Sequence, residues 1–306
     1  MFTVPSNFKT AVAAGKPQRM VFAFTSESRI VSNEDIDMEV GVDFHEIFCS
    51  EVDLTIGLTP SSEISFTLFN DDGYFTNFAF GTFDAYLGVL TGSATNDTAN
   101  SGARPAIEIQ AETSTFTVQY NYRIETYEFI KLGRFIAPRP AIVDLKEIAI
   151  DANDQMTLFD EDMPSAADLG ITSSSYPLRA DTMLQALCTK VGVTAASNTF
   201  LNGTATIASW PDSFSTATMR EVLGQIAELA CSNARFNRDG LLELVWLQTT
   251  SSGTYSESGY TEYSPYWYSV PQITSLHVRN ADSTTETTVG NGTNQYMIQG
   301  NPWLKR

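Results

Sequence analysis

The first candidates for chemistry are the acidic residues near the middle of the chain. Residues 151–154 (Asp-Ala-Asn-Asp) begin like the calcium-binding loop of an EF-hand. Gln155 and Met156 then stand where that loop needs a liganding residue and a glycine, so the pattern fails. Residues 160–162 add three more carboxylates that could face a cation. We interpret both acidic runs as a solvated turn that leaves a β-domain.

Histidine and cysteine are too sparse for the usual metal and nucleophile sites. His45 and His277 lie far apart in the chain, each near a strand-like segment. Cys49, Cys188 and Cys231 are odd in number and lack Cys-x-x-Cys spacing, so they predict neither a disulfide framework nor a zinc site. Cys188 and Cys231 fall within apolar helical patterns, and we expect them to be buried as small hydrophobic residues.

Other catalytic patterns are also missing from the sequence. A chain with 36 acidic residues always contains carboxylate pairs, but nothing places two of them at the roughly 5–9 Å that glycoside hydrolysis needs. Residues 289–292 (Val-Gly-Asn-Gly) precede no helix start, so they do not predict a phosphate loop. Neither a Gly-x-Ser-x-Gly elbow nor a P-loop motif occurs. We predict a non-enzymatic protein with no catalytic residue, metal site or cofactor.

The densest aromatic cluster offers a binding surface instead. Tyrosine and tryptophan provide large contact areas with few rotatable bonds, which suits sugar or protein recognition. The alternative is a strand-rich linker that packs against a neighbouring domain. We favour packing or a subunit interface over glycan binding. The cluster begins at Tyr255, and its candidate contact residues are Tyr260, Tyr263, Tyr266, Trp267 and Tyr268.

The charge of the chain limits the classes of partner. The formal net charge of −18 repels the phosphate backbone, so stable nucleic-acid binding is not expected. A high negative charge most often serves solubility. It would also suit the inner surface of a channel past which DNA slides without binding. The chain lacks the run of about 20 apolar residues that a membrane-spanning helix needs. Residues 1–16 show no secretory signal pattern, so we expect a soluble product of the bacterial cytoplasm.

The first half of the chain has the period of β-strands. Apolar and polar residues alternate at residues 52–58, 64–68 and 116–124, as in half-buried strands. Residues 91–104 are small and polar and predict an exposed loop. Short strands separated by turn residues indicate a barrel or sandwich, so residues 1–163 are expected to form a β-barrel domain. Further strands are expected at residues 20–24, 86–90, 107–109, 129–136 and 147–150.

From residue 164 the apolar period becomes helical. One helix is expected over residues 183–191, with Asp181 as its N-cap and Gly192 as its stop. A second is expected over residues 219–230, because Thr218 and Glu221 have the spacing of a capping box. Residues 234–247 then read as strand, tight turn and strand. Residues 164–250 are therefore expected to form an α+β module with two helices and a hairpin.

The last segment, residues 251–306, resumes strand alternation only briefly. Residues 273–278 and 295–298 alternate, and residues 282–294 between them predict a polar loop. So few strands leave sheet edges open, and we interpret the segment as the first strands of a second β-barrel that is incomplete. The expected fold class is α+β, mostly β.

Three segments carry a resemblance to a known family. Residues 54–73 (from Leu-Thr-Ile-Gly-Leu-Thr-Pro to Asn-Asp-Asp-Gly) and residues 221–244 (from Glu-Val-Leu-Gly to Leu-Leu-Glu-Leu) resemble stretches of tail-tip hub proteins. Such proteins are encoded by phages and prophages of Gram-positive gut bacteria. Residues 296–304 are similar to the family's Asn-Pro-aromatic-Leu turn. The three segments occur in the family's order and span most of the chain.

This resemblance implies the fold of baseplate hubs and of the N-terminal part of tail-associated lysins and tail endopeptidase-type proteins. In that family two barrels bracket smaller α+β modules. A homotrimer closes the distal end of the tail tube, leaving a lumen through which DNA passes. The implied partners are a distal tail or tail tube protein, the tape measure protein, and a tip fibre or downstream tail protein. The implied location is the tail tip of the virion. The chain departs from the family by ending where the second barrel should continue, and it carries no peptidase or lysozyme domain.

Other functions remain as alternatives to the hub. A receptor- or carbohydrate-binding tail-tip module would rest on the aromatic cluster and on residues 91–104. A cell-wall hydrolase would need an acid pair in a cleft, and a secreted surface protein would need a signal peptide. For the hub itself, the net charge of −18 suggests an acidic inner wall, which a neutral or basic lumen would contradict.

Overall fold

The structure is a computed structural model with two compact units, each built from non-contiguous segments. Unit 1 comprises residues 1–46, 61–157 and 236–240, and unit 2 comprises residues 47–60, 158–235 and 241–306. The structure describes residues 4–25, 29–46, 56–76, 78, 80–100, 104–138, 141–142, 146–246, 275–279, 286–290, 295–299 and 301–304. The expected division at residues 163 and 250 stays a prediction.

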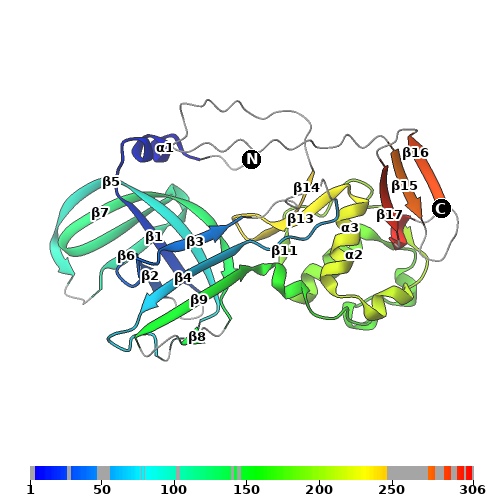
Figure 1. Cartoon of the computed structure of the whole chain (residues 1–306), viewed down its shortest axis with the longest axis horizontal. Coiled ribbons are helices and arrows are strands. Elements are labelled where there is room, and N and C mark those ends of the chain that lie inside the picture. The colour runs from blue at the N-terminus through cyan, green and yellow to red at the C-terminus, as the bar shows by residue number, and fades with distance from the viewer. Residues whose placement is uncertain are drawn as a thin grey trace. The chain divides into compact units, whose positions relative to one another are not determined.

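Unit 1 is built on one antiparallel sheet (Figure 1). A short helix, α1 (Ser6–Ala13), precedes the sheet. The sheet has nine strands, of which β6 (Ala106–Gln110) pairs with β7 and β8 (Ala141–Ile142) pairs with β9. The order of the other strands is β2 (Arg29–Ser32), β1 (Gln18–Phe24), β5 (Thr82–Asn100), β7 (Thr115–Ile136), β9 (Glu147–Asp154), β4 (Glu63–Phe69) and β3 (Val42–His45).

The sequence alternation explains how this sheet makes its core. Along β4, Ile64, Phe66 and Leu68 are buried, while the residues between them face the other side. Aromatic rings fill the core at contact distance, and the centroids of Phe22 and Phe66 lie 4.1 Å apart. Stacked and edge-on aromatic pairs add to the stability that burial already gives. The core also includes Phe24, Phe83, Phe135, Ile148 and Ile150.

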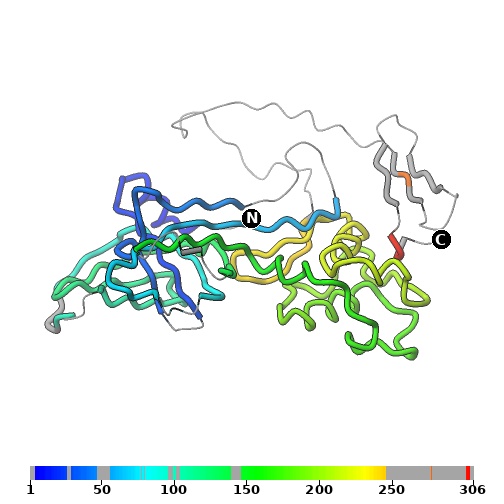
Figure 2. Tube along the Cα trace, turned by 60° about the horizontal axis from the view of Figure 1, so that its bottom comes forward, coloured from blue at the N-terminus to red at the C-terminus, as the bar shows by residue number. Residues whose placement is uncertain are grey.

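The expected loop at residues 91–104 is wrong, because residues 91–100 belong to the long strand β5. Thr95 lies opposite Arg123 and Asn100 lies opposite Asn121 in the ladder with β7. The two strands run side by side in both views (Figures 1 and 2). Residues 91–95 are exposed, as their polarity predicts. Hydrogen bonding to the backbone of β7 keeps them in a strand even though their side chains bury little.

The mostly β, α+β class is confirmed, but the expected barrel is not. The strand path of unit 1 has two ends, β2 and β3, and no described strand joins them. The sheet is therefore open over the part of the chain that the structure describes.

Unit 2 combines two helices with three small sheets. The helices are α2 (Ala180–Val191) and α3 (Met219–Leu229). β10 (Leu178–Arg179) pairs with β12 (Thr206–Ile207), and β14 (Leu241–Trp246) lies between β11 (Thr194–Ala195) and β13 (Ser232–Phe236). β15 (Ser275–Arg279) lies between β16 (Glu286–Gly290) and β17 (Gln295–Gln299). Short 3-10 turns complete the chain: η1 (Ala111–Thr113), η2 (Gln155–Phe159), η3 (Ala167–Leu169), η4 (Ser173–Ser175), η5 (Asp212–Thr216) and η7 (Pro302–Leu304).

The helix boundaries follow their capping residues, with one exception. Thr218 and Glu221 form the predicted capping box, in which Thr218 Oγ1 accepts from the Glu221 amide at 3.2 Å. Gly192 ends α2 in the left-handed conformation, with φ +76°. Asp181 is not the N-cap, which is Arg179. The Asp181 carboxylate lies in the first turn and accepts from Arg179 Nε at 3.0 Å instead.

Two other expected segments differ from the structure. The polar loop expected over residues 282–294 contains β16, whose Thr288 lies opposite His277 of β15. The strand expected over residues 52–58 is described only from residue 56, and residues 56–58 are in no named strand. The first difference arises because β16 pairs with β15, which local polarity does not report.

The packing of Phe116 against Gly88 gives a test of unit 1. A Cβ on Gly88 would lie 2.5 Å from Phe116 Cε1. Phe116 is fully buried beside Tyr127, whose ring centroid lies 5.0 Å away, so the ring has little room to move. We expect Gly88→Ala to lower the free energy of unfolding by about 1–3 kcal/mol in urea titrations.

The matched control for this test is Gly92→Ala in the same strand. Nothing lies within 4 Å of a Cβ on Gly92, so this variant should stay within about 0.5 kcal/mol of wild type. Equal stabilities for the two variants would contradict the described packing of Phe116.

Candidate functional site

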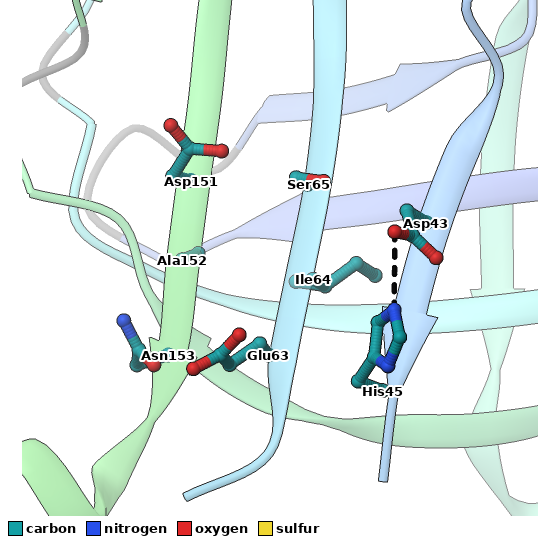
Figure 3. A pocket seen from close by; sticks show the side chains of 8 residues that line it. All are labelled: Asp43, His45, Glu63, Ile64, Ser65, Asp151, Ala152 and Asn153. Carbon is teal, nitrogen blue, oxygen red and sulfur yellow. Dashed lines mark hydrogen bonds and ion pairs between the residues drawn. The ribbon is translucent and has the colours of Figure 1, made fainter.

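The outer face of β3, β4 and β9 carries a cluster of polar side chains, which we call the polar face. Its members are Asp43, His45, Glu63, Ser65, Asp151 and Asn153 (Figure 3). Because alternate residues of a strand point to opposite sides, these side chains share one surface. On the other side Ile64 and Ala152 are buried in the core, which fixes the strands that carry them.

The strand register arranges the polar face in two cross-strand rows. His45 lies opposite Glu63, which lies opposite Asn153. In the second row Ser65 is the middle residue, between Asp43 and Asp151. Directly opposed residues in antiparallel strands have Cβ atoms about 5 Å apart, so each row brings polar groups into reach of one another. The rows line a cavity of about 310 Å³.

The polar face combines three carboxylates, which accept hydrogen bonds, with His45, Ser65 and Asn153, which can both donate and accept. His45 Nε2 lies 3.1 Å from Asp43 Oδ2, and both side chains are exposed. Serine, histidine and aspartate are the residue types of a catalytic triad, in which the histidine bonds the nucleophile. Here Ser65 stands opposite Asp43, and no hydrogen bond joins it to His45. The face therefore presents carboxylates to an incoming group without a base aligned on a nucleophile.

The acidic run at residues 151–154 belongs to this sheet, so its interpretation as a solvated turn is corrected. Asp154 is buried, and its carboxylate accepts hydrogen bonds from Ser61 Oγ and from the Ser62 amide at 2.9 Å each. Asp151 is exposed on the polar face. The second acidic run, residues 160–162, is paired with an arginine: Arg220 Nη2 donates to Asp160 Oδ2 at 2.9 Å. In the described ranges, no three His, Cys, Asp or Glu residues are placed to hold a metal ion.

The buried charge of Arg19, elsewhere in unit 1, is engaged by the partly exposed carboxylate of Glu34. Arg19 donates to Glu34 at 2.7 Å and also to Tyr120, which in turn donates to Glu34. Burial raises the pKa of Glu34, but hydrogen bonds from Arg19, Ser32 and Tyr120 outweigh it and hold the pKa at about 2. Such a network fixes the packing of β1, β2 and β7 rather than serving a ligand.

A second junction of polar and backbone groups surrounds α3 in unit 2, and we call it the α3 junction. Residues 56–59 run along β13, where the Gly57 amide donates to Ser232 O and the Ala234 amide donates to Leu58 O, each at 2.8 Å. The same segment touches α3, because a Cβ on Gly57 would lie 3.0 Å from Gly224 O. Gly57 has φ +83°, a conformation that glycine adopts without strain.

The C-terminal segment docks on the same helix. Asn301 Nδ2 donates to Gln225 O at 2.7 Å and to Glu228 Oε2 at 3.0 Å. Its side-chain oxygen accepts from the Trp303 amide at 3.1 Å. The Trp303 side chain is buried, and its ring centroid lies 5.7 Å from that of Phe214. The Asn-Pro-Trp turn is thereby held to α3 by hydrogen bonds and to η5 by the packing of Trp303 on Phe214.

Glu228 is the ionisable group at the centre of the α3 junction. Burial raises its pKa, and the hydrogen bond from Asn301 only partly opposes this effect. Burial also raises the pKa of Cys231, and the nearby Glu228 carboxylate raises it further. A cysteine whose pKa is raised is a weak nucleophile at neutral pH.

The residues singled out from the sequence fall in different places. The cluster Tyr260, Tyr263, Tyr266, Trp267 and Tyr268 lies outside the described residues, as does Cys49. Cys188 is buried in α2 as expected, whereas Cys231 is half-buried. His45 and His277 lie on β3 and β15, as their strand-like contexts predicted. The polar face was not predicted from the sequence, although the alternation at residues 42–45 and 63–66 indicates polar residues on one side of each strand.

None of the described helices is both long and apolar enough to cross a membrane.

The raised pKa of Glu228 predicts a pH-dependent stability difference. Because the folded-state pKa lies above the unfolded one, the folded protein binds the proton more tightly. The resulting stabilisation is fully present below the unfolded pKa and is lost as the pH rises through the folded pKa. Glu228→Gln keeps an acceptor for Asn301 without the buried charge. We expect it to raise the thermal midpoint at pH 7.5, with the gain shrinking toward pH 4.

The control for this measurement is Glu161→Gln, because Glu161 is exposed in the same unit. It should leave the midpoint unchanged at both pH values. A loss of stability in Glu228→Gln at pH 7.5 would contradict the described environment of Glu228.

The comparisons with known proteins yield similarity to solved structures. No protein-family model matches the chain, and no curated protein matches its sequence. The fold is similar to the crystal structure of the 43 kDa tail protein of prophage MuSo2 from Shewanella oneidensis. The TM-score is 0.46 and the sequence identity 11%, over 92% of this chain and 72% of that chain. At this level of similarity, the function has to be inferred from the residues of the chain itself.

Proposed function

We propose that this protein is a structural subunit of a bacteriophage tail. More specifically, we propose a homotrimeric hub that closes the distal end of the tail tube and connects it to a tip fibre or downstream tail protein. Above the hub it would meet a distal tail or tail tube protein and the tape measure protein. In this role the protein acts by shape and surface, without catalysis or a cofactor.

The observation that carries the proposal is the α3 junction. The segments whose sequences resemble tail-tip hubs are far apart in the chain, yet parts of all three meet there. Residues 56–59 lie against α3 and β13, and Asn301 bonds the same helix at Gln225 and Glu228. If the resemblance came from composition alone, the resembling residues would be expected at unrelated places in the structure. Here the resembling residues form one packed structural element, as expected when a shared fold requires them.

The architecture of unit 1 supports a scaffold role. Its sheet is open, and the path ends at two short strands, β2 and β3. Sheet edges with free backbone groups pair readily with further strands, which is how subunits can extend a sheet into a larger wall. The polar face is a shallow cluster of polar side chains on the outside of such a sheet.

The acidic groups of the polar face suit a surface past which DNA moves. Asp43, Glu63 and Asp151 are all exposed there. Carboxylates repel phosphates and offer no counterion-release gain, so DNA passes without being held. As part of the proposal we assign these three carboxylates to the lumen wall.

Negative-stain electron microscopy of the purified full chain tests the proposal. We expect class averages with three-fold rings around a central hole, and light scattering that gives three times the mass of one chain. A reconstruction that turns the polar face away from the hole would contradict the lumen assignment.

Monomers at every concentration would contradict the hub. Monomers that bind glycans, with binding lost in Trp267→Ala, would instead favour the receptor- or carbohydrate-binding alternative.

A further inference from the structure

Helix α1 and the residues just after it present a basic and apolar surface, which we call the α1 patch. We define it by Lys9 and Val12 of the helix and by Lys16, which follows the helix. Lys9 and Val12 are three residues apart and share one side of the helix. Phe8, one turn before Val12 in the helix, is 6% exposed and anchors α1. Val12 is 40% exposed, and both lysines are exposed.

The lysines of the α1 patch are unusual for this chain. Acidic residues outnumber basic ones by 36 to 18, so most basic side chains can form an ion pair with a carboxylate. In unit 1, Arg19, Arg104, Arg123, Lys131 and Arg134 all form ion pairs. Lys9 and Lys16 form none with any residue that the structure describes. Their charges are therefore available to a partner.

A turn before β3 presents the complementary surface, which we call the turn patch and define by Met38, Glu39 and Val40. Met38 is 52% exposed and Val40 is 69% exposed, two of the three highest values among the large apolar residues that the structure describes in unit 1. Glu39 is exposed and forms no ion pair with a described residue. The patch thus joins two apolar side chains to one free negative charge.

The turn patch is held in a fixed conformation. Asp37 Oδ1 accepts from the amides of Glu39 at 2.9 Å and Val40 at 3.4 Å. The Asp37 carbonyl accepts from the Gly41 amide at 2.9 Å, and Gly41 has φ +84°. The Asp37 amide donates to Thr67 O of β4 at 2.8 Å, which ties the turn to the sheet. A surface that is already ordered loses little conformational entropy when it binds.

Single exposed apolar residues are common on protein surfaces and need no explanation. Two of them lie on one braced turn, next to an acid that has no ion pair among the described residues. They match the exposed valine and the two exposed lysines of the α1 patch in both polarity and charge. The match suggests a second copy of the same chain as the partner, because each copy carries both surfaces.

We infer that the turn patch of one copy docks on the α1 patch of the next copy. Val12 packs against Met38 and Val40, while Glu39 faces Lys9 and Lys16. The two patches are different surfaces, so the contact is heterologous and generates a ring when its rotation closes. This inference rests on the proposed trimeric hub and names the contact between its subunits.

Charge reversal and rescue test this contact in the full-length protein. Lys9→Glu and Glu39→Lys each place like charges together, and the trimer contains three such contacts. We expect each single variant to raise the concentration for half-assembly, measured by light scattering and sedimentation equilibrium, by about tenfold or more. The double variant restores an opposite pair and should return to within about threefold of wild type.

The matched control is Lys190→Glu, which reverses an exposed lysine of α2 outside both patches and should leave assembly unchanged. A second pair tests the apolar part: Val40→Asp should weaken assembly, whereas Leu201→Asp, at a 54% exposed leucine of unit 2, should not. Circular dichroism and thermal unfolding of each variant establish that it is folded.

The possible results separate this contact from the proposed function. Single variants that assemble like wild type would overturn the contact while the trimeric hub stands. Weakened single variants without rescue in the double variant would overturn the pairing of these two patches. A monomeric wild-type chain would overturn both the contact and the hub.

Discussion

Unit 2 depends on one close approach between backbones, that of residues 56–59 to α3. A Cβ on Gly224 would lie 2.9 Å from Gly57 O, and a Cβ on Gly57 would lie 3.0 Å from Gly224 O. A side chain at either position would clash, so both positions need glycine. Gly57 has a further reason, because its φ of +83° is a conformation that favours glycine. Glycine in a helix interior costs about 1 kcal/mol relative to alanine, a cost that the packing of the segment offsets. The hydrogen bonds to β13 and the docking of Asn301 are built on this approach.

Unit 1 meets a different constraint, because an acid-rich chain must fold without accumulating repulsion. Its buried charges are matched inside networks such as Arg19 with Glu34, and Arg104 with Asp35 at 2.6 Å. The surplus carboxylates then lie on exposed surfaces, among them the polar face. Among the residues that the structure describes, what is left for partners is the polar face, the two lysines of the α1 patch and a braced apolar turn. These features suit an assembly subunit that contacts copies of itself and lets DNA pass.

The sequence predicted those features that depend on neighbouring residues. Alternation at Ile64, Phe66 and Leu68 predicted β4, and the spacing of Thr218 and Glu221 predicted the start of α3. Prediction failed where distant residues decide the outcome. The wrong N-cap at Asp181 has a local cause, the hydrogen bond from Arg179 two residues before it. Residues 91–100, in contrast, are a strand only because β7 lies opposite them. The polar face is of the same kind, since Asp43, Ser65 and Asp151 become neighbours only through the register of three strands. The aromatic cluster around Trp267 lies outside the described residues, and its role as an interface stays a prediction.

The central claim is that the segments resembling tail-tip hubs form one packed junction on α3, and Gly224→Ala tests it most directly. In an exposed helix interior this substitution stabilises by about 1 kcal/mol, because alanine has the higher helix propensity. At the α3 junction the new methyl group meets the backbone of Gly57, so we expect a loss of about 1–3 kcal/mol in the free energy of unfolding. Thr189→Ala, at an exposed position of α2, is the control for helix propensity and should be neutral or stabilising. Destabilisation by Gly224→Ala alone would support the account, and stabilisation by both variants would contradict it.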